Sequence, residues 1–193
     1  MPYNLPQRKS PRATWHDYNG ANYFVTFCTK NRELYFGDVV DGRMELSEIG
    51  EWAWQCAEKI ETINDNVFVP EFVVMPNHVH LIVIMDNADG RLPQCERLPQ
   101  CERLPYHDSR IDDNPEINEE MQRRAYCCGR LSHIIGQFKS AVTKYANAHD
   151  IPFMWQPRFH DHIIRNQLEM NRIADYIQNN PMKWELDRFY KKR

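Results

Sequence analysis

Two histidines separated by one residue, His78 and His80, have a spacing that is compatible with a chemical role. They begin an apolar run over residues 78–85, and side chains of a strand alternate between its faces, so both imidazoles would project from the same face. Such a pair can bind one divalent ion. The alternative is that each is a structural histidine held by hydrogen bonds, because an unpaired buried imidazole costs free energy. A second pair, His160 and His162, shows that the spacing alone is not specific.

A tyrosine and an asparagine near the C-terminus form a second candidate group. Tyr176 and Asn180 are four residues apart in a segment where Met170, Ile173 and Ile177 recur with helical spacing. The phenol and the amide would therefore be neighbours on one helical surface, at the border of the apolar stripe. From that border a side chain could reach both a metal ion and solvent, although plain packing at the core margin is the alternative.

The elements that must position these residues follow from the apolar pattern. The sequence predicts strands at 22–29, 67–75, 78–85 and 159–164, and helices over 49–63, over 131–145 and between Asn166 and Pro181. Pro76-Asn77 predicts a tight turn between the two middle strands, which makes them antiparallel. The order strand, helix, strand, strand, helix, strand is that of an α+β, ferredoxin-like (split βαβ) fold. We expect an antiparallel sheet with helices on one side, plus a C-terminal helix that carries the tyrosine.

The length of 193 residues allows one ordinary domain, and 42% hydrophobic residues can form a buried core. No run approaches the roughly 18 apolar residues that a membrane-spanning helix needs. Residues 1–15 are polar and lack the apolar centre of an export signal. The six cysteines include no C-x-x-C pair, and the chain does not resemble a small disulfide scaffold. Reduced thiols are therefore the simplest interpretation. We therefore expect a cytoplasmic protein that does not bind membranes.

Acidic and basic residues are unevenly distributed along the chain, although the formal net charge is only -3. Residues 123–193 hold thirteen Lys or Arg against six Asp or Glu, an excess that could attract phosphate or could simply be a solvated surface. Residues 86–122 are acidic, and within residues 91–105 the hexapeptide Arg-Leu-Pro-Gln-Cys-Glu occurs twice. A proline in each short repeat excludes a helical solenoid. We predict a single domain, residues 1–193, with a low-complexity acidic insertion at about 86–122.

Four segments together resemble a known family. They are Met75–Val83 (MPNHVHLIV), Trp155–Phe159 (WQPRF), His162–Asn166 (HIIRN) and Asp175–Lys183 (DYIQNNPMK). In this order they are similar to the REP-associated tyrosine transposases, members of the single-tyrosine HUH transposase superfamily, in which U stands for a hydrophobic residue. The resemblance runs through most of the chain except the insertion, and it implies the same ferredoxin-like core.

The resemblance also implies roles for the candidate residues. His78 and His80 would hold a Mg²⁺ or Mn²⁺ ion on the scissile phosphate, and Tyr176 would attack that phosphate to form a 5′-phosphotyrosine and release a 3′-hydroxyl. Asn180 would be the third metal ligand, although Gln178 is also near. Imidazole suits Mn²⁺ better than Mg²⁺, so the identity of the metal stays open.

The implied substrate is single-stranded or hairpin DNA with palindromic repeat elements. The sequence does not decide whether the protein is a monomer or a homodimer. Basic residues that surround the candidate site in sequence could contact phosphates; they are Lys139, Arg158, Arg165, Arg172 and Lys183. Trp155 and Phe159 could stack on unpaired bases, and an N-terminal arm with Arg8, Lys9 and Arg12 could touch DNA, although core packing and a solvated tail are simpler explanations.

We therefore expect a metal-dependent transposase or nuclease that cleaves and rejoins DNA strands through Tyr176. The first alternative is a protein derived from such a transposase that binds hairpin DNA without cutting it. The second is a small zinc protein that uses both H-x-H pairs and has no relation to DNA.

Overall fold

The structure, a computed structural model, describes residues 21–86 and 129–192. The predicted acidic insertion, apart from Asp86, lies outside the described residues, as does the N-terminal arm with Arg8, Lys9 and Arg12. The strands are β1 (Ala21–Cys28), β2 (Gly37–Val40), β3 (Arg43–Leu46), β4 (Val67–Phe68), β5 (Phe72–Met75), β6 (His78–Met85) and β7 (His160–Ile164). The α-helices are α1 (Glu48–Glu58), α2 (Ile60–Ile63), α4 (Gly129–Ala148) and α5 (Gln167–Gln178), with 3₁₀ turns η1 (Lys30–Arg32) and η2 (Pro181–Leu186).

The main sheet has the strand order β4-β6-β1-β7, and β5 also pairs with β6. All of these pairings are antiparallel, and β1 and β6 are its two central strands. With β4 and β5 taken as one interrupted strand, this is the order of the split βαβ fold, so the predicted ferredoxin-like class is confirmed.

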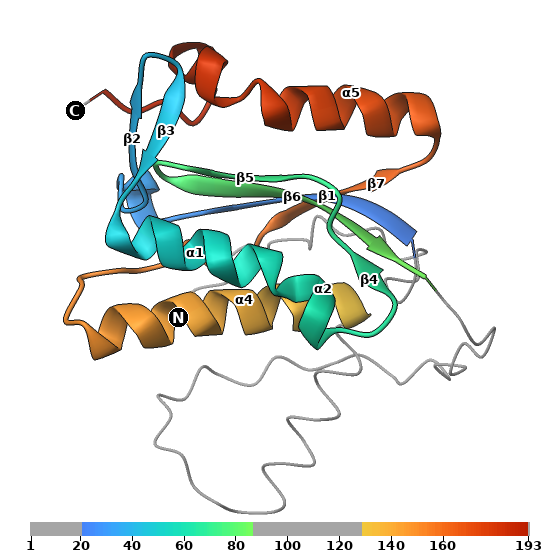
Figure 1. Ribbon diagram of the computed structural model, residues 1–193, viewed down its shortest axis with the longest axis horizontal. Helices are drawn as coiled ribbons and strands as arrows, with labels where there is room; N and C mark the ends of the chain where they lie inside the picture. The colour runs from blue at the N-terminus through green and yellow to red at the C-terminus, as the bar shows by residue number, and fades with distance from the viewer. Residues whose placement is uncertain (1–20, 87–128, 193) are drawn as a thin grey trace, which may run out of the picture.

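Helices lie on both faces of this sheet, but in unequal numbers (Figure 1). The helices α1 and α4 cover one face, where alternate residues of β6 such as Val79, Leu81 and Val83 join the larger core cluster. The helix α5 crosses the opposite face, as expected for the added C-terminal helix. His78 and His80 point toward this second face, because Val79 between them belongs to the first.

Side-chain caps fix where two of the helices begin. Ser47 Oγ accepts a hydrogen bond from Gly50 N at 3.2 Å at the start of α1, and Asn166 Oδ1 accepts one from Glu169 N at 2.9 Å at the start of α5. The second cap sets where the helix that carries Tyr176 begins. The predicted helix over residues 49–63 is interrupted at Lys59, which separates α1 from α2.

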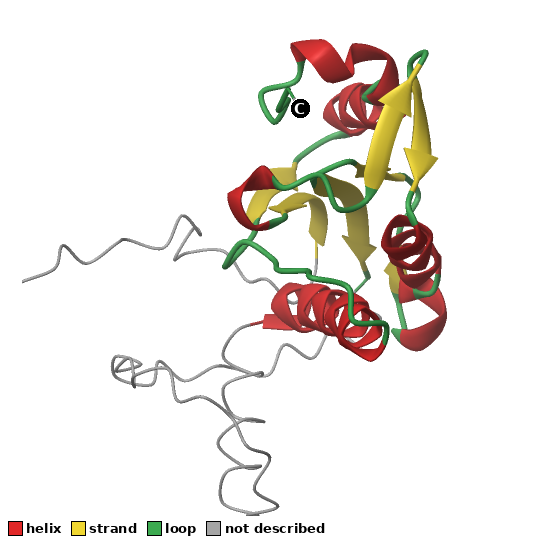
Figure 2. Ribbon diagram, turned by 90° about the vertical axis from the view of Figure 1, so that its left-hand side faces the viewer, coloured by secondary structure: helices red, strands yellow, loops and turns green. Residues whose placement is uncertain are grey.

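Two details of the strands differ from the sequence expectation. The predicted strand 67–75 is divided, because residues 69–71 leave the ladder around Pro70, which has no amide hydrogen to donate. The hairpin of β2 and β3 was not predicted; Figure 2 shows it standing apart from the main sheet. Its turn residues Asp41 and Gly42 have φ angles of 50° and 72°, the left-handed conformation that an Asp-Gly turn favours, so the sequence did carry its signal.

Candidate active site

The two histidines of β6, His78 and His80, are deeply buried polar residues of the candidate site. His78 is 0% exposed and His80 is 1% exposed, and their ring centroids are 4.5 Å apart. Phe189, from the C-terminal segment, packs over both rings with centroid distances of 4.6 Å and 6.0 Å. The pair therefore lies in a desolvated environment, in which any polar atom needs a partner.

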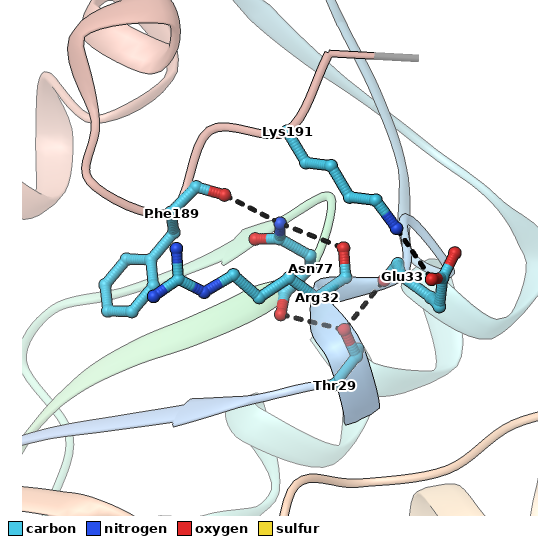
Figure 3. Close-up of polar contacts among 6 residues, drawn as sticks. All are labelled: Thr29, Arg32, Glu33, Asn77, Phe189 and Lys191. Carbon is cyan, nitrogen blue, oxygen red and sulfur yellow. Dashed lines mark hydrogen bonds and ion pairs between the residues drawn. The ribbon is translucent and has the colours of Figure 1, made fainter.

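Hydrogen bonds determine which nitrogen of His78 carries the proton. Asn77 Nδ2 donates to the carbonyl oxygens of Arg32 and Phe189 at 3.3 Å and 2.8 Å, so Asn77 Oδ1 is an acceptor (Figure 3). This oxygen is 2.9 Å from His78 Nδ1, which must donate to it. The lone pair of His78 therefore resides on Nε2, and this buried atom has no hydrogen-bond partner among the described residues.

His80 is held from the neighbouring strand and faces the tyrosine. Its Nδ1 is 2.8 Å from Thr26 Oγ1 on β1, and its Nε2 is 3.3 Å from Tyr176 Oη on α5. When Nδ1 donates its proton to Thr26, the lone pair of His80 resides on Nε2, as it does in His78. Such outer partners orient imidazoles that bind metals.

Tyr176 connects the buried histidines to the surface. Its side chain is 39% exposed, so the phenol can contact His80 and still be reached from solvent. The hydroxyl donates to Asp187 Oδ2 at 3.0 Å. Burial and the neighbouring Asp187 carboxylate raise the pKa of Tyr176 to about 12, so the phenol is protonated at neutral pH. The tyrosine from the C-terminal helix thus meets the histidine pair within one chain.

Asn180 and Asp187 supply oxygen atoms next to this group. Asn180 is 2% exposed; its Nδ2 donates to Asp187 Oδ2 at 3.0 Å, while its Oδ1 is buried and has no partner among the described residues. Single ligand atoms of His78, His80 and Asp187 all lie within 4.8 Å of one another. Asp187 was not predicted from the sequence, since no motif or helical spacing connects it to Tyr176 or to the histidines.

Asp187 is placed by a C-terminal segment that is fixed to the turn between β5 and β6 and to the residues that follow β1. Phe189 O accepts from Asn77, and Lys191 Nζ pairs with Glu33 at 2.6 Å (Figure 3). In addition, Arg32 Nη1 donates to Arg188 O at 2.8 Å. Within this segment Phe189 N donates to Asp187 Oδ1 at 2.7 Å. The carboxylate is therefore oriented by contacts that are distant in sequence.

The donor set fits a divalent metal ion. Burial, followed by Arg188 and Arg32, lowers the pKa of His78 to about 3, and burial together with His78 lowers the pKa of His80 well below its usual value. Both imidazoles are therefore neutral at physiological pH, the form that binds metals. Two neutral imidazoles, a carboxylate and an amide oxygen make a mixed nitrogen and oxygen site, and unpartnered His78 Nε2 and Asn180 Oδ1 are atoms that an ion would satisfy.

The lowered pKa values predict how the metal-free protein responds to acid. Below pH 6.5 an unfolded histidine takes up a proton that the buried native one does not, so stability falls as the pH falls. Each histidine contributes a slope of about 1.4 kcal/mol per pH unit in that range. We expect the free energy of unfolding in EDTA to drop less between pH 7 and pH 5 in His78→Gln than in the wild type, as measured by urea denaturation; equal drops would contradict the prediction.

Other candidate residues lie away from this group. Gln178 Nε2 donates to Glu71 Oε1 at 2.7 Å, and His162 Nε2 pairs with Glu169 Oε1 at 2.7 Å. Lys139 Nζ donates to the carbonyl oxygens of Gln156 and Arg158. The remaining predicted contacts are exposed; they are Arg158, Arg165, Arg172 and Lys183.

Within residues 21–86 and 129–192, His78, His80 and Asp187 are the one group of three or more His, Cys, Asp or Glu whose ligand atoms converge. The second H-x-H pair is therefore not part of such a group in the described chain. None of the helices in these two stretches has the length and apolar character required to cross a membrane.

Comparison with solved structures shows which known fold this protein has. The structure is similar to that of a REP-associated tyrosine transposase bound to a REP hairpin, with a TM-score of 0.54 and 19% identity over 92% of this chain and 74% of that one. The resemblance expected from the four sequence segments is thus confirmed in the fold, which is that of a REP-associated tyrosine transposase. No model of a protein family matches the sequence.

The chain also has a relative in sequence. It is 33% identical over 195 residues to an uncharacterized protein of Haemophilus influenzae (strain ATCC 51907 / DSM 11121 / KW20 / Rd), covering 96% of this chain and 94% of that protein. The chain belongs to the same family as this Haemophilus protein.

Proposed function

We propose that this protein is a metal-dependent enzyme that cleaves and rejoins single-stranded or hairpin DNA through Tyr176. The observation that carries the proposal is the 3.3 Å contact between Tyr176 Oη and His80 Nε2, beside the converging ligand atoms of His78 and Asp187. A nucleophile, a metal site and a carboxylate that can accept a proton are the parts that strand transfer at phosphorus requires. The REP hairpin bound to the structurally similar transposase supports hairpin DNA as the substrate class.

The metal would be Mg²⁺ or Mn²⁺, held by Nε2 of His78 and His80 and by oxygens of Asn180 and Asp187. When bound, it neutralises charge on the nonbridging oxygens of the scissile phosphate. Asn77 and Thr26 keep the two imidazoles oriented. All four proposed ligands and Tyr176 come from one chain, so a partner subunit is not needed to complete the site.

The covalent step uses groups that already contact one another. The oxygen of Tyr176 forms a bond to phosphorus while the bond from phosphorus to the 3′-oxygen breaks, which leaves a 5′-phosphotyrosine and a 3′-hydroxyl. The phenolic proton passes to Asp187, to which the hydroxyl donates at 3.0 Å, and the leaving 3′-oxygen takes a proton from water; the hydroxide so formed takes the proton back from Asp187, which restores the carboxylate. Attack of a 3′-hydroxyl on the phosphotyrosine reverses the step and rejoins a strand.

A DNA-binding protein that does not cut is the second candidate. The observation that favours it is the burial of both histidines beneath Phe189, with Trp184 also against His78, which leaves the two imidazoles at most 1% exposed. Both candidates bind hairpin DNA, and they differ only in the chemical step.

One assay distinguishes the two candidates. The full chain is incubated with Mn²⁺ or Mg²⁺ and hairpin-bearing single strands that carry a label on one side or the other of the unpaired segment. A protein–DNA adduct that survives denaturation and retains only the label 3′ to the cut supports the enzyme and the 5′-phosphotyrosine. Binding with no adduct in either metal supports the non-cutting protein, and EDTA is the control that must abolish the adduct.

The third metal ligand can be tested with neighbouring asparagines. We expect Asn180→Ala to weaken Mn²⁺ binding at least tenfold, about 1.4 kcal/mol, because the buried carboxamide oxygen is lost. Asn180→Asp keeps an oxygen there and should restore most of the affinity. Asn179→Ala is the matched control, since that amide donates to Asp175 O outside the site. Calorimetric titration gives the affinities, and equal values for Asn180→Ala and the wild type would exclude the role.

A further inference from the structure

A hydrogen bond between side chains ties the last turn of α5 to the main sheet. Gln178 Nε2 donates to Glu71 Oε1 at 2.7 Å. Glu71 lies in the connection between β4 and β5, and its carbonyl oxygen accepts from Ile82 N at 2.8 Å. Ile82 follows His80 by two residues on β6. The bond therefore links the helix that carries the tyrosine to the strand that carries the histidine pair.

Tyr176 and Gln178 lie on opposite sides of a buried residue. Successive residues of an α-helix are about 100° apart around its axis, so these two side chains point about 100° to either side of Ile177. Ile177 is 1% exposed and belongs to one apolar cluster with Met75 and Ile82, on the face of the sheet that α5 crosses (Figure 1). This apolar contact holds the helix against the sheet, and the two polar side chains lie at its margins.

The contacts at these margins determine how α5 is rotated about its own axis. Tyr176 Oη is 3.3 Å from His80 Nε2 at one margin, and Gln178 is bonded to Glu71 at the other. Apolar burial is not directional, so the contact of Ile177 resists rotation less than a hydrogen bond does. A phenolic oxygen lies roughly 8 Å from its helix axis, so a rotation of about 10° moves it by about 1.4 Å. A displacement of about 1 Å can slow a reaction about a hundredfold.

The two ends of α5 are held to the sheet in different ways. Its first residue follows β7 after only two residues, so the chain itself keeps that end at the sheet edge. Tyr176 is in the last turn, at the end that the bond of Gln178 fixes. Near the first end, Gln167 Nε2 donates to Asn171 Oδ1 at 2.8 Å, a bond that stays within the helix. Gln167 therefore provides a control of the same residue type on the same helix.

We propose that Gln178 is a positioning residue for strand transfer: through Glu71 it fixes the rotation of α5 that places Tyr176 Oη against His80. The inference rests on the proposed function, because the attack by Tyr176 is the step that this positioning serves. The sequence left open a role for Gln178 as a metal ligand. Its amide is instead directed to Glu71, so it acts through the helix and not on the metal or the phosphate.

The first measurement requires neither metal nor DNA. The full chain is labelled with 3-fluorotyrosine, and the fluorine NMR resonance of Tyr176 is identified by its absence from the Tyr176→Phe protein. The Tyr176 ring lies 6.1 Å from that of Phe24 and 5.3 Å from that of His80, between centroids, so their ring currents make the resonance sensitive to rotation of α5. In EDTA we expect Gln178→Ala to shift or broaden this resonance and Gln167→Ala to leave it unchanged.

The second measurement is the rate of adduct formation at saturating hairpin DNA and Mn²⁺. Gln178→Ala should slow the adduct at least fivefold and change hairpin affinity less than twofold, and Glu71→Ala should do the same. Because both act through one bond, the double alanine variant should be no slower than either single variant. Gln178→Glu combined with Glu71→Gln restores the bond with donor and acceptor exchanged, so the rate and the resonance should return toward those of the wild type.

Several results would overturn the inference. An unchanged Tyr176 resonance in Gln178→Ala is one, and a changed resonance with a wild-type adduct rate is another. A slow adduct with an unchanged resonance would indicate that Gln178 contacts the DNA, and failure of the exchanged pair to recover would exclude the bond to Glu71 as the cause. The proposed enzyme is judged separately: a resonance that responds as expected, in a wild-type chain that forms no adduct, counts against the enzyme alone.

Discussion

Replacing Tyr176 with phenylalanine should abolish the denaturation-resistant protein–DNA adduct, with a loss of at least a thousandfold, while hairpin affinity changes less than twofold. The substitution removes one oxygen atom, and that oxygen is the proposed nucleophile that contacts His80 Nε2 and Asp187. A thousandfold loss corresponds to about 4 kcal/mol of activation free energy. The fold should survive, because the lost contacts of the hydroxyl, with His80 Nε2 and Asp187 Oδ2, are each worth about 1 kcal/mol.

Tyr145→Phe is the matched control for this prediction. Its hydroxyl donates to Glu48 Oε1 at 2.8 Å, on the face of the sheet that α1 and α4 cover. The same atom is removed far from the proposed site, so the adduct should form as in the wild type. Quantitative gel analysis of labelled hairpin against time gives both rates. An adduct that persists in Tyr176→Phe would show that another residue attacks the DNA.

The second large effect concerns the metal. We expect His78→Ala to lower Mn²⁺ affinity at least a hundredfold and to bring the adduct below detection, because His78 Nε2 is a proposed ligand atom that is buried and has no hydrogen-bond partner among the described residues. Saturating Mn²⁺ at one hundred times its dissociation constant should stabilise the wild type against unfolding by about 2.7 kcal/mol and the variant hardly at all. Thermal or urea unfolding with and without Mn²⁺ measures this difference independently of any DNA reaction.

His162→Ala provides the control from the second H-x-H pair. His162 is bonded to Glu169 on the exposed side of β7, so its removal should leave the stabilisation by Mn²⁺ intact. Circular dichroism of all variants in EDTA checks that each one folds. If His162→Ala loses as much metal affinity as His78→Ala, the proposed ligand set is incorrect.

Much of the site could be anticipated from residue order because it depends on local periodicity. The alternation of a strand places His78 and His80 on one face, and the Asn166 cap together with the apolar stripe of α5 fixes which side of that helix carries Tyr176. These relationships need only neighbouring residues, so they are already contained in the sequence. The roles of His78, His80, Asn180 and Tyr176 in chemistry stay predictions until the variants are measured.

The tertiary structure alone decided what approaches the histidines from elsewhere in the chain. Asp187 contacts Tyr176 and Asn180 only because the C-terminal segment folds back onto Asn77 and Arg32. The hydrogen bonds that hold this segment join residues more than one hundred positions apart, and no periodicity in the sequence encodes them. A cavity of about 300 Å³ that Arg32, Arg158 and Arg188 line likewise combines the end of β1, the loop before β7 and the C-terminal segment. Sequence specified which side chains share an element and a face, because those depend on backbone geometry over a few residues. Packing of one element on another set the distances between them, because it depends on the complementary shape of surfaces that meet only in the folded chain.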